Sequence, residues 1–443
     1  APPSGGGIAA AQIIVSSGES IQDAIDAAAP GDTIVVAPGT YTEDLDIDKS
    51  LTLISSDGAV ATTIAGQLHI DLLDEEVMVL GEYGAGFTII NDSEGPGIVA
   101  TLDYWSALTV EGNTITGCDT VGLRFHRVHY FSGAVVRGNE ITDNGESGIE
   151  LGTFGEAVKY HSTVSILDNV ITGNDHQGID WNDTFANSHG LIQGNTVTGN
   201  GDDGIWHDDV EHGSSLDILD NVVSDNAGCG IYIYEYEDGC QGLIQGNTIE
   251  RNGEDGFYLS DDPSHGSRLT VQNNTVVQNG GFGLRFDDVE YGGYLAISEN
   301  ELAQNAYGGI RLYEIDSGAE GLIEGNSITG NDGYGILVDS GLDYGGYLVI
   351  ESNTITGTQS GSVTGEAPGG WDVEYYLNCG DVIPGSETVY VNNVPTSEYT
   401  LYPDSGTVVF DVAPEGTVTV DYLYGGAGIY VGEGRFVHAA SGG

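Results

Sequence analysis

Apolar and polar residues alternate in short runs along most of the chain. Residues 243–249, Leu-Ile-Gln-Gly-Asn-Thr-Ile, are typical of these runs. In an extended strand such a run places apolar side chains on one side and polar side chains on the other. No run between these strands carries a helical stripe long enough to connect parallel strands by a helix. The pattern therefore predicts strands joined by short turns, in a chain that coils.

The runs recur with a nearly constant period. The first asparagine of each repeat stands at Asn113, Asn139, Asn169, Asn195, Asn221, Asn247, Asn274, Asn300, Asn326 and Asn353, so successive intervals are 26, 30, 26, 26, 26, 27, 26, 26 and 27 residues. A second asparagine follows five residues later in most repeats, and a glycine before an apolar residue closes each one, as at Gly204 and Gly230. Such a period is typical of stacked units that bury a core only against their neighbours.

The expected fold is all-β, a parallel β-helix of about a dozen coils with strands roughly 4.8 Å apart and a length on the order of 60 Å. Asparagine tolerates the left-handed backbone of a sharp corner, and stacked amides can bond along the column. Glycine is expected where the backbone turns most tightly. Unrelated Asn-Gly hairpins in a sandwich would not keep this period.

The ends of the chain differ from the repeats. Residues 1–12 predict an N-terminal tail, residues 13–360 the β-helix, residues 361–425 a small antiparallel, sandwich-like β-domain, and residues 426–443 a C-terminal tail. Residues 20–29 predict a helix with a capping box from Ser20 to Asp23, which covers the first coil. In the last tail, Ile429, Tyr430, Val431 and Phe436 suit a strand that either joins the sheet edge of another subunit or packs on its own rod.

The order IQDAID, GDTIVVAPGTY, LDIDKSLTLIS and TTIAG over residues 21–66, followed by the Asn-Thr-Ile-Thr-Gly-Asn repeats, resembles right-handed β-helix proteins of the pectin-lyase-like superfamily, including NosD-like surface and periplasmic proteins. The resemblance spans roughly residues 12 to 360. It implies a right-handed coil with three faces. For function it implies only a range, from lyases, epimerases and hydrolases to adhesins and inert scaffolds.

The net charge of the chain limits the kinds of partner that it can bind. The chain has 68 acidic and 10 basic residues, a formal net charge of -58, which argues against nucleic acid and anionic membrane surfaces. It fits divalent cations, a high-salt habitat or a need for solubility. No apolar run is long enough to span a membrane. Cys118, Cys229, Cys240 and Cys379 lack CxxC spacing, so zinc is not expected and their pairing stays open. We expect an extracellular location, with a signal peptide already removed.

Counting from the closing glycines predicts an outward face of aromatic, arginine and carboxylate side chains. This face suits either a sugar or a protein interface. Its expected binding residues are Arg124, Asp180, Trp206, Tyr232, Tyr234, Tyr258, Arg285, Arg311 and Tyr313.

Acidic residues crowd the loop that follows this face. They are Asp208, Asp209, Glu211, Asp261, Asp262, Asp287, Asp288 and Glu290. Carboxylates stacked at coil spacing repel by roughly 1 kcal/mol per pair in water. Bound Ca²⁺, salt or full solvation must relieve that repulsion. Oxygen ligands suit Ca²⁺, although no DxDxDG loop occurs.

An active site needs a base and an acid beside a charge stabiliser. The sequence offers His207, Asp208 and His212 in one coil, and Arg285, Asp287 and Arg311 in two others. His207 falls at an inward position, which favours packing. The nearest motif, Asp262-Pro263-Ser264-His265, departs from the Asp-Pro-His order of alginate epimerases.

The absence of a catalytic motif, the regular repeat and the spare end strand favour an extracellular structural protein. Copies of itself would be its partners in a filament, sheath or surface layer. The alternatives are a polysaccharide lyase or epimerase, or a carbohydrate-binding adhesin, that uses the outward face.

Overall fold

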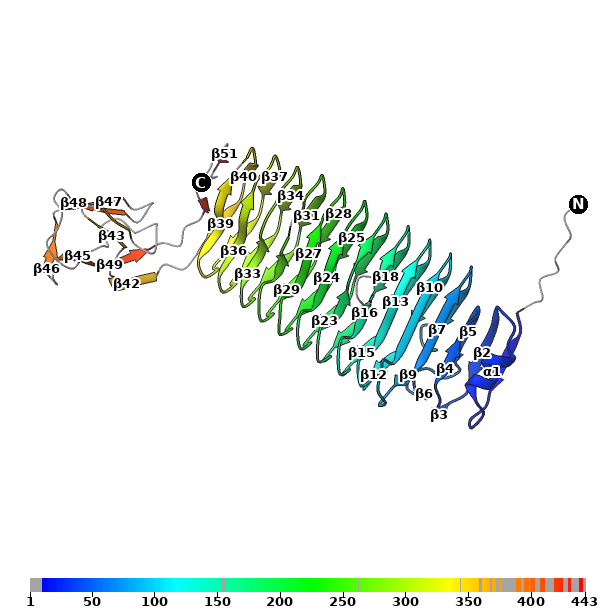
Figure 1. The fold of residues 1–443 in the computed structure, drawn as a ribbon. Helices are drawn as coiled ribbons and strands as arrows, with labels where there is room; N and C mark the ends of the chain where they lie inside the picture. The colour runs from blue at the N-terminus through cyan, green and yellow to red at the C-terminus, as the bar shows by residue number, and fades with distance from the viewer. Residues whose placement is uncertain are drawn as a thin grey trace, which may run out of the picture.

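The computed structural model describes residues 10–152, 157–261, 263–342 and 344–357, together with strands between Gly361 and Ala440. The chain winds into a right-handed parallel β-helix of about 12 coils (Figure 1). Each coil contributes one strand to each of three long parallel sheets, here named A, B and C. The predicted fold class is confirmed.

The three sheets follow one another around every coil. Sheet A comprises β1 (Gln12–Val15), β2 (Asp32–Val36), β5 (Leu51–Ser55), β8 (Val77–Leu80), β11 (Ala107–Glu111), β14 (Gly133–Arg137), β18 (Thr163–Leu167), β22 (His189–Gln193), β25 (Ser215–Leu219), β28 (Gln241–Gln245), β31 (Arg268–Gln272), β34 (Tyr294–Ser298), β37 (Glu320–Glu324), β40 (Tyr347–Glu351) and β51 (His438–Ala440).

Sheet B has short strands throughout: β3 (Gly39–Tyr41), β6 (Thr62–Ala65), β9 (Thr88–Ile90), β12 (Thr114–Thr116), β15 (Glu140–Thr142), β19 (Val170–Thr172), β23 (Thr196–Thr198), β26 (Val222–Ser224), β29 (Thr248–Glu250), β32 (Thr275–Val277), β35 (Glu301–Ala303), β38 (Ser327–Thr329) and β41 (Thr354–Thr356).

Sheet C carries the outward face described below. Its strands are β4 (Leu45–Ile47), β7 (Leu68–Leu73), β10 (Ile98–Asp103), β13 (Leu123–His129), β16 (Ile149–Leu151), β20 (Ile179–Trp181), β24 (Ile205–Val210), β27 (Ile231–Tyr236), β30 (Phe257–Leu259), β33 (Phe282–Phe286), β36 (Gly308–Ile315), β39 (Tyr334–Leu342) and β50 (Ile429–Val431), with the side strands β17 (Val158–Lys159) and β21 (Thr184–Phe185).

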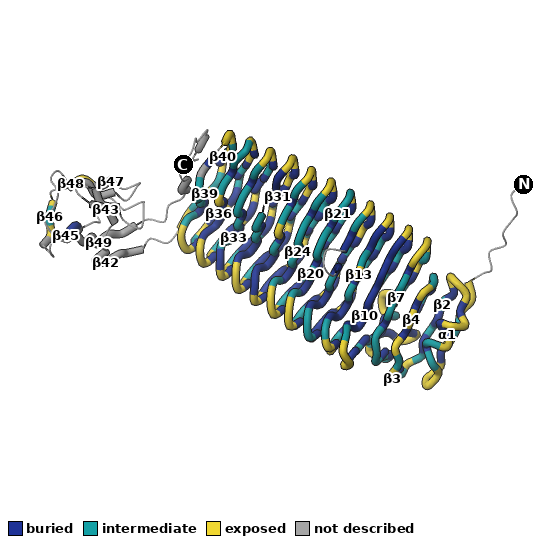
Figure 2. Tube along the Cα trace, viewed as in Figure 1, coloured by how far each residue is buried: buried dark blue, intermediate teal, exposed yellow. Residues whose placement is uncertain are grey.

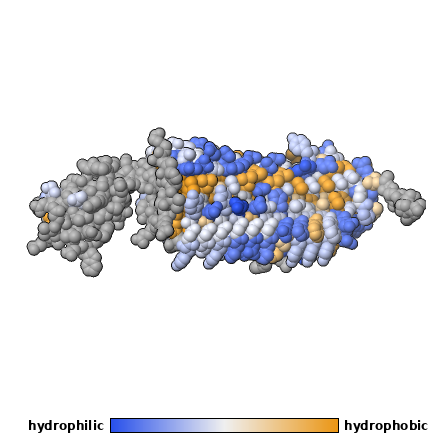
Figure 3. All heavy atoms as spheres, turned by 90° about the horizontal axis from the view of Figure 1, so that it is seen from above, coloured by the Kyte–Doolittle hydropathy of each residue, from blue (hydrophilic) through white to orange (hydrophobic). Residues whose placement is uncertain are grey.

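One apolar core runs the length of the rod. Alternate residues of each strand point inward, so buried and part-exposed positions alternate along the strands, while most exposed residues lie at the corners (Figure 2). In β16 and β20, for example, Ile149, Leu151, Ile179 and Trp181 are completely buried. Seen from above, hydrophobic and hydrophilic residues form lines parallel to the rod axis (Figure 3), because equivalent positions stack coil upon coil.

The asparagines form two buried ladders, one at each end of sheet B. Asn247 shows the pattern: its backbone N–H and its amide nitrogen both donate to Asn274 Oδ1, at 2.9 and 3.0 Å, and the amide also donates to Ile218 O at 2.8 Å. The asparagine was expected to have the left-handed backbone. In the structure the residue before it has this conformation instead, as at Gly246 and Asp220. The asparagine instead satisfies the backbone groups that the corner leaves free.

The closing glycines also differ from the expectation. Gly204 does not have a left-handed backbone; a Cβ at this position would lie 2.7 Å from both Asn226 Nδ2 and Gly230 O. Glycine is therefore required by the close approach of the next coil's ladder, not by the turn.

A short helix covers the first coil. α1 (Ile21–Ala27) buries Ile21 and Ile25 against it. Ser20 accepts from Asp23 N at 3.1 Å, as the capping box predicts. The returning contact comes instead from Glu43, whose carboxylate accepts from Ile21 N and Ser20 Oγ, each at 2.7 Å.

At the other end the chain returns to its own rod. β50 pairs in parallel with β39, aligning Ile429, Tyr430 and Val431 with Ile336, Leu337 and Val338, and β51 pairs with β40. The end strand is thus not a free donor for another subunit, and the alternative of packing on its own rod holds. Phe436 lies outside the described residues.

Between these points, the strands from residues 361 to 424 pair antiparallel in two four-stranded sheets. The first contains β42 (Gly361–Glu366), β49 (Val418–Tyr424), β45 (Thr388–Val391) and β46 (Val394–Thr396), and the second β43 (Gly369–Trp371), β44 (Glu374–Tyr376), β48 (Thr407–Phe410) and β47 (Tyr399–Tyr402).

Cys118, Cys229 and Cys240 are buried free thiols; Cys379 lies outside the described residues. In the described part of the chain the seven-residue α1 is far too short to cross a bilayer.

Candidate functional site

The outward face lies on sheet C. Strand register aligns one residue from each coil in a single row: Arg124, Glu150, Asp180, Trp206, Tyr232, Tyr258, Arg285 and Arg311. We call this row the outward column. It places seven of the nine predicted binding residues side by side; the other two, Tyr234 and Tyr313, are each 40% exposed and lie two positions further along their strands.

A groove leads into the N-terminal end of this column. Its volume is about 490 Å³ and its lining includes Asp46, His69, Val99, Arg124 and His126. Asp46, His69 and Val99 continue the outward column upstream. His69 Nδ1 lies 3.4 Å from Asp46 Oδ1, and His69 Nε2 lies 3.7 Å from Asp71 Oδ2. The groove therefore presents both hydrogen-bond donors and hydrogen-bond acceptors.

Two carboxylates stand directly beyond the groove. Glu150 accepts a hydrogen bond from Arg124 Nη2 at 2.7 Å, and its side chain is 12% exposed. Asp180 occupies the same position in the next coil. Burial, followed by the negative charge of Glu150, raises the pKa of Asp180 to about 7, while Arg124 opposes the rise. One carboxylate thus has an arginine partner, and its neighbour keeps a proton at near-neutral pH.

Aromatic rings follow the carboxylates. Trp206 and Tyr232 are parallel, with ring centroids 6.5 Å apart, and Tyr258 meets Tyr232 edge-on at 5.1 Å. These three side chains are partly exposed. Aromatic surface next to hydrogen-bonding carboxylates suits a sugar ring, which has both apolar and hydroxylated parts.

The C-terminal end of the column is a closed network. Asp287 accepts from Tyr258 Oη at 2.6 Å and from Arg285 Nε at 3.1 Å, and Arg285 lies over the Tyr258 ring at 4.0 Å. Arg311 binds Asp339 at 2.7 Å. Burial and the Asp287 contact raise the pKa of Tyr258, so its phenol stays protonated. The predicted catalytic group of Arg285, Asp287 and Arg311 is therefore brought together, but its members already satisfy one another.

The structure confirms the inward position predicted for His207 and so removes this residue from the candidate catalytic residues. Its side chain is fully buried, lies 5.6 Å from the Trp181 ring and bonds Thr184 Oγ1 at 3.0 Å. Burial lowers its pKa to about 3. An inward side chain cannot reach a ligand on the outer face. His212 lies at the corner after β24, 3.5 Å from Asp238 and against the Phe185 ring, and so apart from the outward column.

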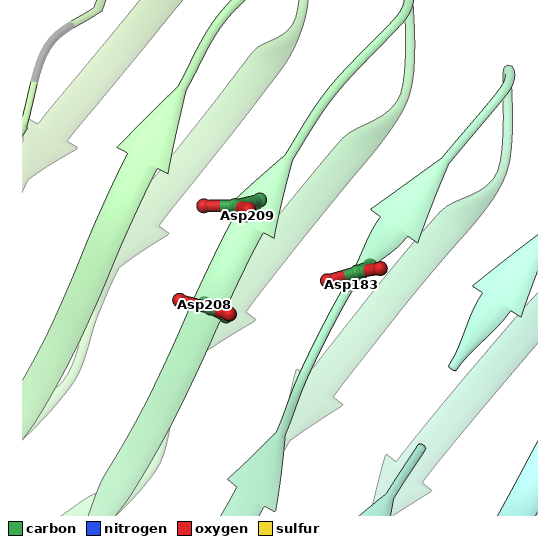
Figure 4. A group of neighbouring side chains, drawn as sticks. All are labelled: Asp183, Asp208 and Asp209. Atoms are coloured by element: carbon green, nitrogen blue, oxygen red, sulfur yellow. The ribbon is translucent and has the colours of Figure 1, made fainter. Parts of the chain in front are cut away.

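Two residues that were predicted in the acidic loop, Asp208 and Asp209, lie on a strand and come together with a third carboxylate, Asp183. Oxygens of Asp183, Asp208 and Asp209 lie within 4.8 Å of one another, with Asp208 and Asp209 on β24 and Asp183 from the coil before (Figure 4). Burial and neighbouring acids raise the pKa of Asp209 to about 7. The oxygen donors fit Ca²⁺, but Lys159 Nζ already lies 3.3 Å from Asp183. Calcium therefore remains a prediction.

Among the described residues, the other predicted metal ligands lie near further negative charges but form no group of three carboxylates like this one. Burial, then Glu290 and Asp287, raise the pKa of Asp288 to about 6, and burial with nearby acids raises the pKa of Glu211 and of Glu290. Asp261 belongs to the same group of charges. Asp262 lies outside the described residues.

Four residues of the site are not among the predicted binding, catalytic or metal-binding residues: His69, His126, Glu150 and Asp183. His126 stands four positions after the closing Gly122 and so lies on the predicted outward face. Glu150 stands in the predicted outward row and was available to the same counting that gave Asp180. His69 precedes the first asparagine repeat, so no count from the closing glycines reaches it. Asp183 approaches β24 only through the coil-on-coil stacking.

The family described as right handed beta helix region matches residues 88–188, 183–237 and 235–317, just over half of the chain. The chain belongs to this family. No curated protein matches this β-helix protein.

Solved structures share the fold of this right-handed β-helix protein. The catalytic unit of a GH87 alpha-1,3-glucanase from Streptomyces thermodiastaticus strain HF3-3 matches with a TM-score of 0.53 and 17% identity, over 76% of this chain and 65% of that chain. The match therefore spans less than two thirds of the glucanase unit. A mutant of the periplasmic alginate epimerase AlgG matches with a TM-score of 0.50 and 14% identity, over 78% and 85%.

Proposed function

We propose that this β-helix protein binds a neutral polysaccharide along the outward column of sheet C and hydrolyses it at Glu150 and Asp180. The observation that carries the proposal is the pair itself: two carboxylates in adjacent coils, one held by Arg124 at 2.7 Å and the other with its pKa raised to about 7. Two acids whose surroundings separate their protonation states are suited to the roles of proton donor and anion.

Asp180 donates its proton to the glycosidic oxygen as the bond to the anomeric carbon breaks. Glu150, which is paired with Arg124, attacks that carbon. Water then displaces Glu150 and returns a proton to Asp180. Adjacent strands lie about 4.8 Å apart, close to the roughly 5 Å separation of the two carboxyl groups in retaining glycosidases.

The surroundings of the pair support a chain-like substrate. The groove of about 490 Å³ lies on one side, and Trp206 and Tyr232 lie on the other. A polysaccharide laid along the rod axis would contact both, with the scissile bond between them. Binding on both sides holds that bond against the carboxylates.

Charge favours a neutral glycan. A chain with a formal net charge of -58 repels a polyanion at low ionic strength, and Arg124 is already paired with Glu150. A glucanase catalytic unit shares the fold of this chain.

A second function has one specific observation in its favour. Burial and the Arg124 charge lower the pKa of His126, so a neutral imidazole stands beside an arginine in the groove. A base beside a cation suits proton abstraction from a uronate, as in a lyase or epimerase. Unsaturated products, seen by ultraviolet absorbance, would distinguish this chemistry from hydrolysis.

The filament hypothesis receives no support, because the strand offered for assembly pairs within its own chain. An extracellular location stays part of the proposal. A carbohydrate-binding adhesin would show binding to the same face without turnover.

The test is release of reducing ends from a panel of α-1,3-glucan, laminarin, xylan and dextran, with alginate and polygalacturonate as the anionic arm. We expect the wild type to hydrolyse one neutral polymer of the panel. In Glu150→Gln and in Asp180→Asn the rate of reducing-end release should fall by a factor of about 10² or more. Glu301→Gln, an exposed acid on sheet B, is the matched control. Full activity in both site variants would overturn the proposal.

A further inference from the structure

A second polar pocket lies at the corner between sheets C and A. Its volume is about 350 Å³, and its walls include Tyr104, Tyr130, Tyr160, Asp103, Arg127 and Lys159. Arg127 stands three residues beyond Arg124 on β13, roughly 10 Å along the strand. The pocket is therefore separate from the groove and the carboxylate pair.

Aromatic residues occupy this corner in three successive coils. The rings of Tyr104, Tyr130 and Tyr160 are stacked at 4.8 and 4.7 Å, and a second stack beside them joins Trp105, Phe131 and His161 at 5.3 and 5.1 Å. Trp105 is 57% exposed and Phe131 50%. We call these six residues the aromatic corner.

The fold itself does not require these side chains. All six have left-handed backbones, with φ between 50° and 65°, which costs roughly 1 kcal/mol or more for each bulky residue. Later coils make the same corner with glycine at the second position, as at Gly213, Gly239 and Gly318. Tyrosine recurs at the first position of this corner, as at Tyr291 and Tyr344, but among the described residues only these three coils carry aromatic side chains at both left-handed positions. This doubled strain and exposed aromatic surface indicate a role other than folding.

The pocket offers paired donors and acceptors rather than a net charge. Arg127 binds Asp103 Oδ2 at 2.6 Å, and Lys159 Nζ lies 3.3 Å from Asp183 Oδ2. Three tyrosines add hydroxyl groups at coil spacing. Neutralised ion pairs beside tyrosines match the hydroxyl groups of an uncharged sugar, and the pocket volume lies in the range of small-ligand sites.

We propose that the aromatic corner and its pocket form a second, non-catalytic binding site for the same neutral polysaccharide. This inference rests on the proposed function and adds to it. A polymer held at the corner raises the local concentration of chain ends and segments near the outward column. Short oligosaccharides, which cannot reach both sites, gain nothing from it.

The test replaces Tyr104, Tyr130 and Tyr160 by serine, the residue that Ser317 provides at the same corner position. Tyr291→Ser with Tyr344→Ser, at equivalent corners without the pocket, is the matched control. Both are made in full-length protein carrying Glu150→Gln, so that the polymer survives. Affinity electrophoresis in gels containing the polymer from the panel that wild type hydrolyses measures binding.

We expect the triple variant to weaken polymer binding by about tenfold, with the control unchanged. In the active background, turnover of short oligosaccharides stays at the wild-type level.

Unchanged polymer binding by the triple variant would overturn the corner site and leave the proposed hydrolysis intact. If the wild type hydrolyses no polymer of the panel, the proposed function is overturned instead. The single variant Tyr130→Ser repeats the test should the triple variant melt early. Self-association that depends on the corner, seen by sedimentation velocity, would reassign it to a protein interface and also overturn the proposal.

Discussion

At Asp180 opposing charges act on one carboxyl group. Burial, Glu150 and Asp208 raise its pKa, while Arg124 lowers it, and the result is about 7. A proton donor must hold its proton, so the proposed hydrolysis is expected to decline as the pH rises above about 7.

Two substitutions should move that decline in opposite directions. Arg124→Gln removes the lowering charge and shifts the alkaline limb of kcat/KM to higher pH, with a lower maximal rate because Glu150 loses its partner. Asp208→Asn removes a raising charge and shifts the limb to lower pH. pH–rate profiles of both variants check this; shifts of the same sign would contradict the assignment of Asp180.

The carboxylates of Asp183, Asp208 and Asp209 provide the residue-scale test of calcium. If they bind Ca²⁺, millimolar Ca²⁺ raises the melting temperature of the wild type, and a chelator reverses the rise. Asp209→Asn should abolish this response, whereas Asp288→Asn, in an acidic loop without such a cluster, should keep it. Isothermal titration calorimetry gives an independent measure, and a Ca²⁺ response identical in all three proteins would remove the cluster from consideration.

At the scale of the element, the asparagine ladders hold the corners of sheet B. Asn247→Ala removes the oxygen that accepts from the buried backbone N–H and the amide of Asn221, and it removes the amide that donates to Ile218 O and to Asn274 Oδ1. We expect a loss of roughly 3 kcal/mol in the free energy of unfolding. Asn353→Ala, at the part-buried end of the ladder, should cost less. Urea unfolding of the two variants checks the difference, and equal losses would contradict it.

The partly buried carboxyl groups on and beside the strands of sheet C make a further element-scale prediction. The pKa of Asp203 and of Asp209 is raised to about 7, and that of Asp288 to about 6. The folded protein therefore keeps protons that the unfolded chain loses above pH of about 4. This stabilisation is complete below that pH and disappears as the pH rises through about 7. The melting temperature should fall between pH 5 and 8, and less so in 1 M NaCl; a rise would contradict the shifts.

Alternation and period were enough to predict the coils, the outward column and the first-coil helix, because these depend on local spacing. The sequence could not show which outward residues work together. Glu150 and Asp180 are 30 residues apart, and only the stacking of their coils gives one an arginine partner and the other a raised pKa. The sequence also predicted the left-handed residue one position too late, at Asn247 when it is Gly246, because both residue types tolerate that backbone.

At the scale of the whole molecule, the strand edges at the end of the rod are sites where copies of the protein could associate. The strands β50 and β51 cover the edges of β39 and β40. Deleting residues 426–443 uncovers those edges, so the truncated protein should self-associate more than the full chain, not less. Light scattering of both forms at equal concentration checks this, and reduced association on truncation would restore the donor-strand hypothesis.

The like-on-like register has an evolutionary consequence. Every coil contacts its neighbours through equivalent positions, so a duplicated coil would make the same contacts with the coils on either side. Inserting a second copy of residues 222–247, one period, would extend the three sheets and both ladders and add one more tyrosine, a copy of Tyr232, to the outward column. Such a protein should fold, and its surface for a long glycan would be lengthened by one step without any new design of the core.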